Sequence, residues 1–144
     1  MRILTPLQEQ FLKTFFISSL SSDFFLTGGT ALSAFYLKHR KSEDLDLFTI
    51  DQKLQFDFVN AEVLKIARSL NFKIINQVST GTYLQFIFHY RKENLKIDLV
   101  KDVPVQFGTI RKIQGTFIDS VENIAVNKLL AIFGRTDAKD FIDI

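Results

Sequence analysis

Asp44 and Asp46 are the two residues of this chain whose type and spacing best suit cation binding. They lie in the segment DLDLF (44–48), in which Leu45 and Leu47 alternate with them. In a strand, both carboxylates would leave one face and both leucines the other. Two carboxylates on one face repel each other unless a cation lies between them. The spacing therefore indicates an Mg²⁺ site on one face of a strand.

A glycine turn precedes the aspartates. Residues 24–26 (FFL) form a short apolar run, typical of a buried strand, which ends at residues 27–29 (TGG). Glycine allows a positive φ and lets the backbone approach a bulky ligand closely. We expect Thr30 to cap a helix that begins near Ala31, whose free N–H groups would face an anion. A phosphate-sized turn beside a carboxylate pair predicts Mg²⁺ together with a nucleotide.

The segments around these two motifs resemble a known protein family. GGTAL (28–32), followed by HRKSEDLDLF (39–48), is similar to the AbiEii/AbiGii-type nucleotidyltransferases, the toxin components of some toxin–antitoxin pairs. That family belongs to the polymerase-β-like nucleotidyltransferase superfamily, whose signature is a glycine turn, one helix and an Asp-x-Asp pair. The resemblance implies an α/β fold in which helices flank a small, mixed, twisted sheet.

The resemblance also implies an Mg²⁺-dependent enzyme that transfers an NMP from an NTP to an acceptor, either a tRNA end or a protein hydroxyl. Gly28, Gly29 and Thr30 would hold the phosphates, and the aspartates would bind two Mg²⁺ ions. Arg40 and Ser42, in the basic connection between the motifs, would be further nucleotide contacts. For Arg40, a solvated turn of positive charge is an equally open interpretation. A cognate antitoxin protein is the implied partner.

Asp98 is the candidate third acid. Alternate apolar residues of the segment 94–100 (NLKIDLV) share one face of a strand, and Lys96 and Asp98 share the other. The superfamily's third acid also lies on a later strand of the same sheet. The resemblance therefore supports Asp98 as a metal ligand beside Asp44 and Asp46. An exposed alternating strand would place an aspartate there without any function.

The C-terminal residues carry a second constellation of the family, which is a helical lysine, an arginine and a Lys-Asp-x-x-Asp element. These are matched by Lys128, Arg135 and residues 139–143 (KDFID). The resemblance implies that Lys128 contacts phosphate and that Asp140 is a supporting acid or base. Without it, the two ends of the element form an ordinary i,i+4 surface pair. The resemblance implies further helices beyond this point, so the chain is either a minimal member or a shortened one.

Two helices are expected to cover the sheet. The first occupies residues 1–20, with Thr5 as its cap and Pro6 at its first position. The second runs over residues 56–70, and its apolar period includes Phe58. We interpret the first helix as core cover without a chemical role.

The sheet is expected to form the middle of a single domain, with residues 24–118 as its core. Segments 73–79, 82–90 and 94–100 are rich in β-branched and aromatic residues and predict a meander of hairpins. Residues 107–117 hold two short strand-like pieces. Residues 119–122 (DSVE) have the form of a capping box, which would start the C-terminal helices of residues 119–144.

The composition agrees with one packed domain. The chain has 144 residues, 47% of them hydrophobic, and no cysteine, which suits a reducing cytoplasm. No apolar run approaches the length of a membrane span. The net charge of +2 permits nucleic acid as a partner without arguing for it.

A second class of function stays open from the sequence. A non-catalytic module could keep the nucleotidyltransferase fold and bind a nucleotide or a partner protein. The paired aspartates favour the enzyme, because a domain without catalysis does not need two carboxylates on one face.

Overall fold

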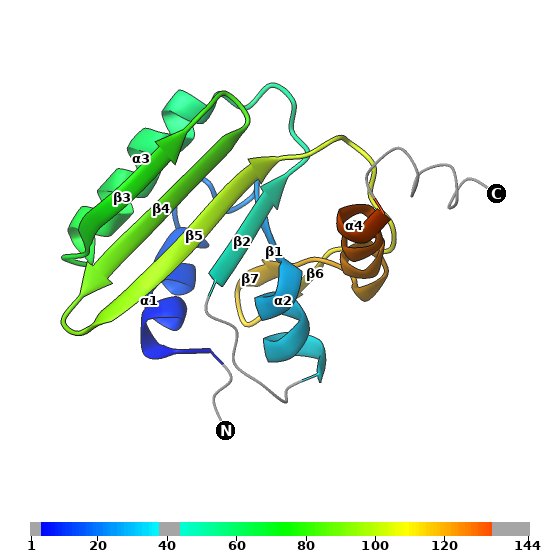
Figure 1. Cartoon of the computed structure of the whole chain (residues 1–144), viewed down its shortest axis with the longest axis horizontal. Helices are drawn as coiled ribbons and strands as arrows, with labels where there is room; N and C mark the ends of the chain where they lie inside the picture. The colour runs from blue at the N-terminus through cyan, green and yellow to red at the C-terminus, as the bar shows by residue number, and fades with distance from the viewer. Residues whose placement is uncertain (1–3, 38–43, 134–144) are drawn as a thin grey trace.

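The computed structural model describes residues 4–37 and 44–133. Within these residues the chain forms one seven-stranded mixed sheet with the order β3-β4-β5-β2-β1-β7-β6 (Figure 1). The elements in chain order are α1 (Pro6–Phe15), β1 (Phe25–Thr27), α2 (Gly28–Ala31), the π-helix η1 (Leu32–Leu37), β2 (Asp44–Thr49), α3 (Phe56–Ser69), β3 (Lys73–Ser79), β4 (Tyr83–Tyr90), β5 (Glu93–Lys101), β6 (Arg111–Ile113), β7 (Thr116–Ile118) and α4 (Val121–Phe133).

The sheet combines local hairpins with two parallel pairings. Strands β3, β4 and β5 form the predicted antiparallel meander, and β6 and β7 form a second, short hairpin. Strand β2 pairs in parallel with β5, and β1 pairs in parallel with β7. These parallel pairs bring segments far apart in sequence to the centre of the sheet. The predicted α/β class, with helices flanking a small mixed sheet, is confirmed.

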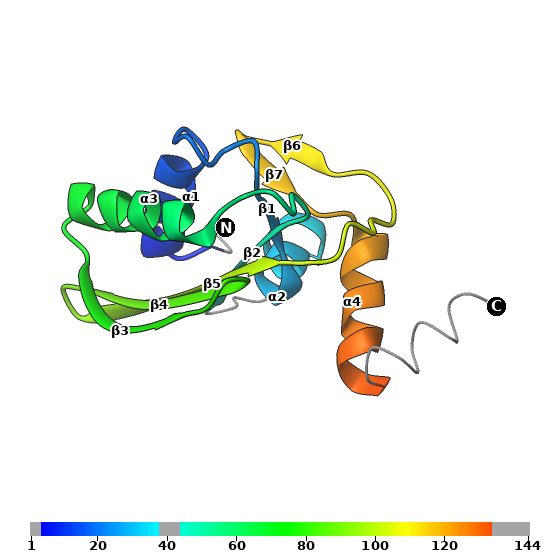
Figure 2. The same ribbon diagram turned by 90° about the horizontal axis from the view of Figure 1, so that it is seen from above.

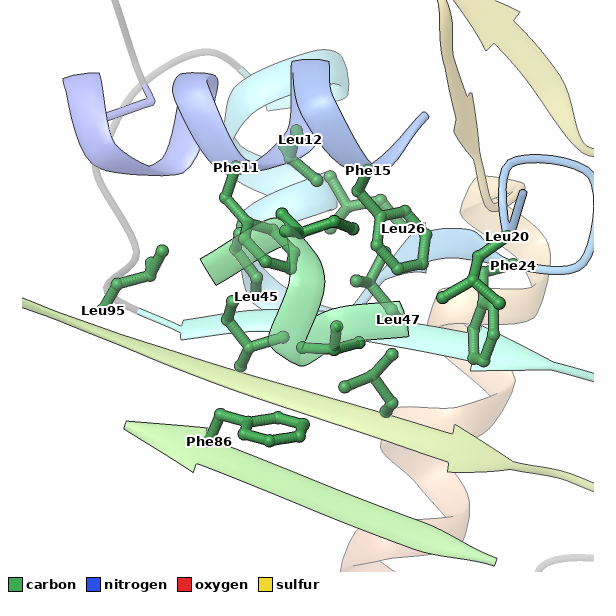
Figure 3. Packing of buried hydrophobic residues seen from close by; sticks show 14 of the residues in the cluster. Phe11, Leu12, Phe15, Leu20, Phe24, Leu26, Leu45, Leu47, Phe86 and Leu95 are labelled. Carbon is green, nitrogen blue, oxygen red and sulfur yellow. The ribbon is translucent and has the colours of Figure 1, made fainter. Parts of the chain in front are cut away.

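Helices α1 and α3 cover one face of the sheet, and the opposite face of β2 and β5 is left uncovered by them (Figure 2). The buried core lies between these helices and the strands. Leu45 and Leu47 of β2 are 0% exposed and point into the same cluster as Phe11 and Phe15 of α1 (Figure 3). Burying these side chains on one face fixes which residues of β2 must lie on the other.

Helix α1 begins as predicted and ends earlier. The Thr5 side chain accepts a hydrogen bond from the Gln8 N–H, and the Gln8 side chain accepts one from the Thr5 N–H. The expectation of a helix across residues 1–20 is wrong at its C-terminal end, because the helix stops at Phe15. Leu20 nevertheless is 0% exposed. The apolar pattern therefore continued into buried turns, which sequence periodicity alone does not separate from a helix.

Helix α3 occupies the expected segment with a different buried face. Phe56, Val59, Val63 and Ile66 are buried, so Phe58 lies off this stripe and is 46% exposed. The prediction that Phe58 belongs to the apolar face is wrong, because Phe56 at the first helical position sets the phase of the helix.

The start of α4 corrects another prediction. The Ser120 hydroxyl accepts the Asn123 N–H at 3.0 Å and thereby caps the helix. The expected capping box from Asp119 to Glu122 is wrong, because the Asp119 side chain is turned toward Thr27 of β1. Among the helices of residues 4–37 and 44–133, none is long and apolar enough to cross a membrane.

Candidate functional site

Both carboxylates of the Asp-x-Asp pair lie on one face of the sheet, as the alternation predicted, and this is the face that α1 and α3 do not cover. Along β2, Asp44 and Asp46 are half-buried while Leu45 and Leu47 are fully buried. The strand therefore holds both carboxylates on one face, anchored from behind by the core.

The pairing of β2 with β5 places Asp98 beside this pair. In this parallel register Asp46 lies opposite Asp98, and Asp44 lies opposite Lys96. Adjacent strands are about 5 Å apart, so side chains that leave the same face at paired positions are neighbours. The structure thus brings together the three acids named from the sequence.

Asp46 is the most perturbed carboxyl group of this cluster. Burial, followed by the neighbouring carboxylates of Asp98 and Asp44, raises the pKa of the Asp46 carboxyl group to about 6. The Lys96 ammonium offsets part of this increase in pKa. A site of this kind favours either a proton or a metal cation.

Two residues of β4 hold the Asp98 side chain. The Tyr83 hydroxyl and the Gln85 amide nitrogen each donate a hydrogen bond to Asp98 Oδ1 at 3.0 Å, and the same amide donates to the Tyr83 oxygen at 2.8 Å. Burial and this hydrogen bond to Asp98 raise the pKa of Tyr83 to about 12. Neither residue was identified from the sequence. The alternation of β4 and its hairpin register with β5 carry the only signal that could have found them.

Lys96 is a further residue that the sequence analysis did not assign. Its ammonium nitrogen lies 3.7 Å from Asp44 Oδ2. This cation lies on the face that carries the aspartates and pairs with the outer member of the Asp-x-Asp motif. Its signal in the sequence was the shared face of Lys96 and Asp98 in β5.

The glycine turn lies directly against the carboxylate cluster. Gly28 has a φ of +75°, and a Cβ atom placed on it would lie 2.3 Å from Asp46 Oδ2. Only glycine fits here, because the backbone is left-handed and the Asp46 side chain already occupies the space that a Cβ atom would need. The turn and the aspartates therefore form one continuous site.

The role expected for Thr30 as a helix cap is wrong. Helix α2 begins at Gly28, and Thr30 lies inside it. The Thr30 hydroxyl instead donates a hydrogen bond to the Asp44 carbonyl oxygen. Thr30 therefore fastens the short helix after the glycine turn to the strand of the aspartates.

The other candidates are an exposed lysine of α4 and residues outside the described part of the chain. Lys128 is exposed on α4, which packs beside η1 (Figure 1). Among the residues that the structure describes, Lys128 forms no ion pair with the three aspartates. The remaining predicted residues fall outside the described part of the chain; they are Arg40, Ser42, Arg135, Lys139, Asp140 and Asp143.

The donor set suits a hard divalent cation, although its side chains have other partners in this structure. Carboxylate oxygens are the ligands that Mg²⁺ prefers. Asp44 is paired with Lys96, and one oxygen of Asp98 is held by β4. Within residues 4–37 and 44–133, no three His, Cys, Asp or Glu side chains are arranged as a ready-made metal site.

The fold is that of the nucleotidyltransferases with which it superposes. One is a proposed nucleotidyltransferase from H. pylori, with a TM-score of 0.64 and 22% identity over 85% of this chain and 55% of that one. Another is JHP933 from Helicobacter pylori, with a TM-score of 0.66 and 22% identity over 89% of this chain and 55% of that one.

The family model for "Nucleotidyl transferase AbiEii toxin, Type IV TA system" matches residues 10–144. The chain belongs to this family, as its two motifs indicated. A relative, the uncharacterised protein aq_aa25 of Aquifex aeolicus (strain VF5), is 29% identical over all of this chain and 66% of its own length. The chain therefore spans about half of the two solved structures and about two thirds of that relative.

Proposed function

We propose that this chain carries the transfer site of an Mg²⁺-dependent nucleotidyltransferase that moves an NMP from an NTP to an acceptor hydroxyl. The observation that carries the proposal is the position of Asp46, which lies opposite Asp98 and against Gly28. This arrangement sets cation ligands beside a backbone that phosphates can approach. Membership of a nucleotidyl transferase family supports the same chemistry.

Asp46 and Asp98 would hold Mg²⁺, and Asp44 would join them by releasing Lys96. The raised pKa of Asp46 supports this assignment, because neighbouring carboxylates already repel it and a cation would relieve that repulsion. Two ions fit the number of carboxylates. Bound Mg²⁺ supplies charge neutralisation at the phosphates and activates the acceptor hydroxyl.

The glycine turn would orient the nucleotide. Gly28 offers backbone without a side chain next to Asp46, Gly29 follows it in the turn, and Thr30 fixes the turn to β2 through the Asp44 carbonyl. We assign these three residues to the β- and γ-phosphates. Further phosphate contacts proposed from the family motifs are Lys128, Arg40 and Ser42.

The transfer forms a bond between the acceptor oxygen and the α-phosphorus of the NTP. The bond from that phosphorus to the α,β-bridging oxygen breaks, and pyrophosphate leaves with the electron pair. The proton of the acceptor hydroxyl passes to a carboxylate of the site, and Asp140 is our candidate for this base. A tRNA end or a protein hydroxyl would be the acceptor.

The biological setting proposed from the family is a cytoplasmic toxin–antitoxin pair. The family description names a toxin of a type IV system, so a cognate antitoxin protein is the expected partner of the whole protein. This chain would then contribute the chemical step of the toxin.

Label transfer from each of four α-labelled NTPs tests the proposal, with Mg²⁺, cell extract and total tRNA as acceptors. We expect label on RNA or protein with the parent chain and none with Asp46→Ala. Because label at the γ-phosphate would leave as pyrophosphate, a γ-labelled NTP is the matched control. If no label is transferred from any of the four NTPs while Mg²⁺-dependent NTP binding is retained, the chain is a nucleotide-binding module and not an enzyme.

A further inference from the structure

Asp119 has a fully buried carboxylate group that accepts four hydrogen bonds. Oδ2 accepts from the Thr27 hydroxyl at 2.7 Å and the Asn123 amide at 2.8 Å. Oδ1 accepts from the Gln106 amide at 2.6 Å and the Ser120 N–H at 2.9 Å. The side chain is 0% exposed. A carboxylate has about four lone-pair sites, so the protein itself satisfies this group completely.

The main chain of Asp119 joins two more elements. Its N–H donates to the Leu26 carbonyl of β1 at 2.8 Å. Its carbonyl accepts from the Tyr36 hydroxyl of η1 at 2.5 Å. One residue thus connects β1, η1, the loop before β6 and the start of α4. A node with this many buried partners is costly to distort, because each lost partner leaves a buried polar group unsatisfied.

Thr27 connects this node to the carboxylate cluster. Its Cα pairs with that of Asp46 in the β1–β2 ladder, and the next residue is Gly28, which lies against Asp46 Oδ2. Thr27 is 2% exposed and donates its hydroxyl to Asp119. The last strand residue before the glycine turn is therefore fixed by a group that never reaches the site surface.

We propose that Asp119 and Thr27 are positioning residues for the glycine turn and for α4. This inference rests on the proposed function, in which the turn binds the phosphates of an NTP. The four hydrogen-bond partners of the Asp119 carboxylate include none of the three aspartates and neither glycine of the turn. Asp119 acts through Thr27 on one side and through Ser120 and Asn123 at the start of α4 on the other. The residue before the glycine turn and the start of α4 are thereby joined through one buried carboxylate.

The primary test replaces Thr27, because Asp119→Asn would leave an amide facing four donors and risks global unfolding. Thr27→Val keeps the shape and β-branching and removes the hydroxyl. Thr27→Ser keeps the hydroxyl and should restore the parent behaviour. The matched control is Thr116→Val, a buried threonine of the neighbouring strand β7 that is 7% exposed.

The first readout needs no activity. In amide exchange followed by NMR, we expect Thr27→Val to raise exchange at the Ser120 and Asn123 N–H groups by about tenfold, or about 1.4 kcal/mol. The resonances of Gly28 and Gly29 should shift in the same variant. In Thr27→Ser and Thr116→Val, the exchange rates and the glycine resonances should be the same as in the parent. Unchanged exchange in Thr27→Val, or an equal change in Thr116→Val, would overturn the proposal.

The second readout is the KM for NTP. Misplacing the turn should raise that KM by between about 10- and 100-fold in Thr27→Val, with a smaller effect on kcat. Thr27→Ser should return the KM to within a few-fold of the parent. An unaltered KM in a Thr27→Val protein that shows the exchange change would reject the link to the site. A parent chain without any transfer would reject the proposed function, while the exchange experiment would still decide the role of Asp119.

Discussion

Asp46 and Asp98 lie opposite each other on the parallel strands β2 and β5, on the face that α1 and α3 do not cover. Helix α3 and strands β3 and β4 separate β2 from β5 in the sequence, and the sheet brings the two strands back side by side. Burial, and next the proximity of Asp98, raises the pKa of Asp46 to about 6.

Asp46→Asn should stabilise the metal-free protein at neutral pH. The folded-state pKa of about 6 exceeds the ordinary value of 3.8, so ionising Asp46 costs the folded state more than the unfolded chain. The gain in the free energy of unfolding should be absent below pH 3.8, appear as pH rises to about 6, and stay constant above it. We expect about 1–3 kcal/mol at pH 7.

Urea denaturation of parent and Asp46→Asn in EDTA, from pH 3.5 to pH 8, measures this difference. Glu62→Gln is the control, because it removes a half-buried carboxylate of α3 whose ion-pair partner is Lys65 of the same helix. A stability difference that is the same at every pH would show that Asp46 carries no proton-linked penalty. With Mg²⁺ and NTP added, the difference in the free energy of unfolding between the two proteins should become smaller, because cation binding stabilises only the parent.

Tyr83→Phe should weaken the site without loss of the fold. The substitution removes a hydroxyl that donates to Asp98 Oδ1 and leaves the ring in place. Because hydrogen bonds to charged groups contribute about 1.5–3 kcal/mol, we expect the Mg²⁺ concentration for half-maximal transfer to rise by roughly tenfold or more. Tyr90→Phe, at the other end of β4, is the matched control. An equal Mg²⁺ concentration for half-maximal transfer in the two variants would show that the Tyr83–Asp98 hydrogen bond does not support metal binding.

Gly28→Ala should disrupt the site through two separable effects. The φ of +75° strains any residue with a Cβ atom. The new Cβ would lie 2.3 Å from Asp46 Oδ2 and would therefore push the Asp46 carboxylate out of its position. Strain alone costs about 1–2 kcal/mol. The displaced carboxylate should abolish Mg²⁺-dependent NTP binding, measured by isothermal titration.

Two other glycines separate these effects. Gly115 has a φ of +85° with no atom near its Cβ position, so Gly115→Ala carries the strain alone. Gly81→Ala meets no neighbouring atom and should be close to neutral. If Gly115→Ala reduced NTP binding as much as Gly28→Ala, the close approach of Gly28 to Asp46 would not matter for binding.

Lys96→Met should raise the pKa of Asp46 above its present value. The Lys96 ammonium lowers this pKa, and its removal leaves the two neighbouring carboxylates uncompensated. The carboxyl ¹³C resonance of Asp46, followed by NMR titration without Mg²⁺, reports the shift directly. Lys65→Met on α3 is the control for loss of a surface lysine. A lower pKa in Lys96→Met would contradict the assigned electrostatics.

The parts of the fold that follow from local periodicity were predictable from the sequence. The alternation in β2 and β5 correctly placed their aspartates opposite their leucines, because a side-chain period of two leaves no other choice once one face is buried. Helix phase and length were less secure. Phe58 was assigned to the wrong face and α1 was extended too far, because apolar residues outside the regular element are buried by tertiary contacts.

The groups that support the site depend on pairing between strands, which the sequence does not encode locally. Tyr83 and Gln85 reach Asp98 only through the β4–β5 register, and Lys96 reaches Asp44 only through the β2–β5 register. Asp119 followed a helix-cap pattern, yet its side chain reaches back 92 residues to Thr27. The family motif indicated Asp44 and Asp46, and strand alternation together with the resemblance indicated Asp98. The structure adds the residues that hold them.

Titration of the NTP-bound protein with Mn²⁺, followed by electron paramagnetic resonance, tests the central claim most directly. If Asp46 and Asp98 hold one cation between their strands, Asp46→Asn and Asp98→Asn should each weaken Mn²⁺ binding by at least about tenfold, while Glu62→Gln should bind as the parent does. Parent-like Mn²⁺ affinity in both aspartate variants would contradict a metal-dependent site at this pair.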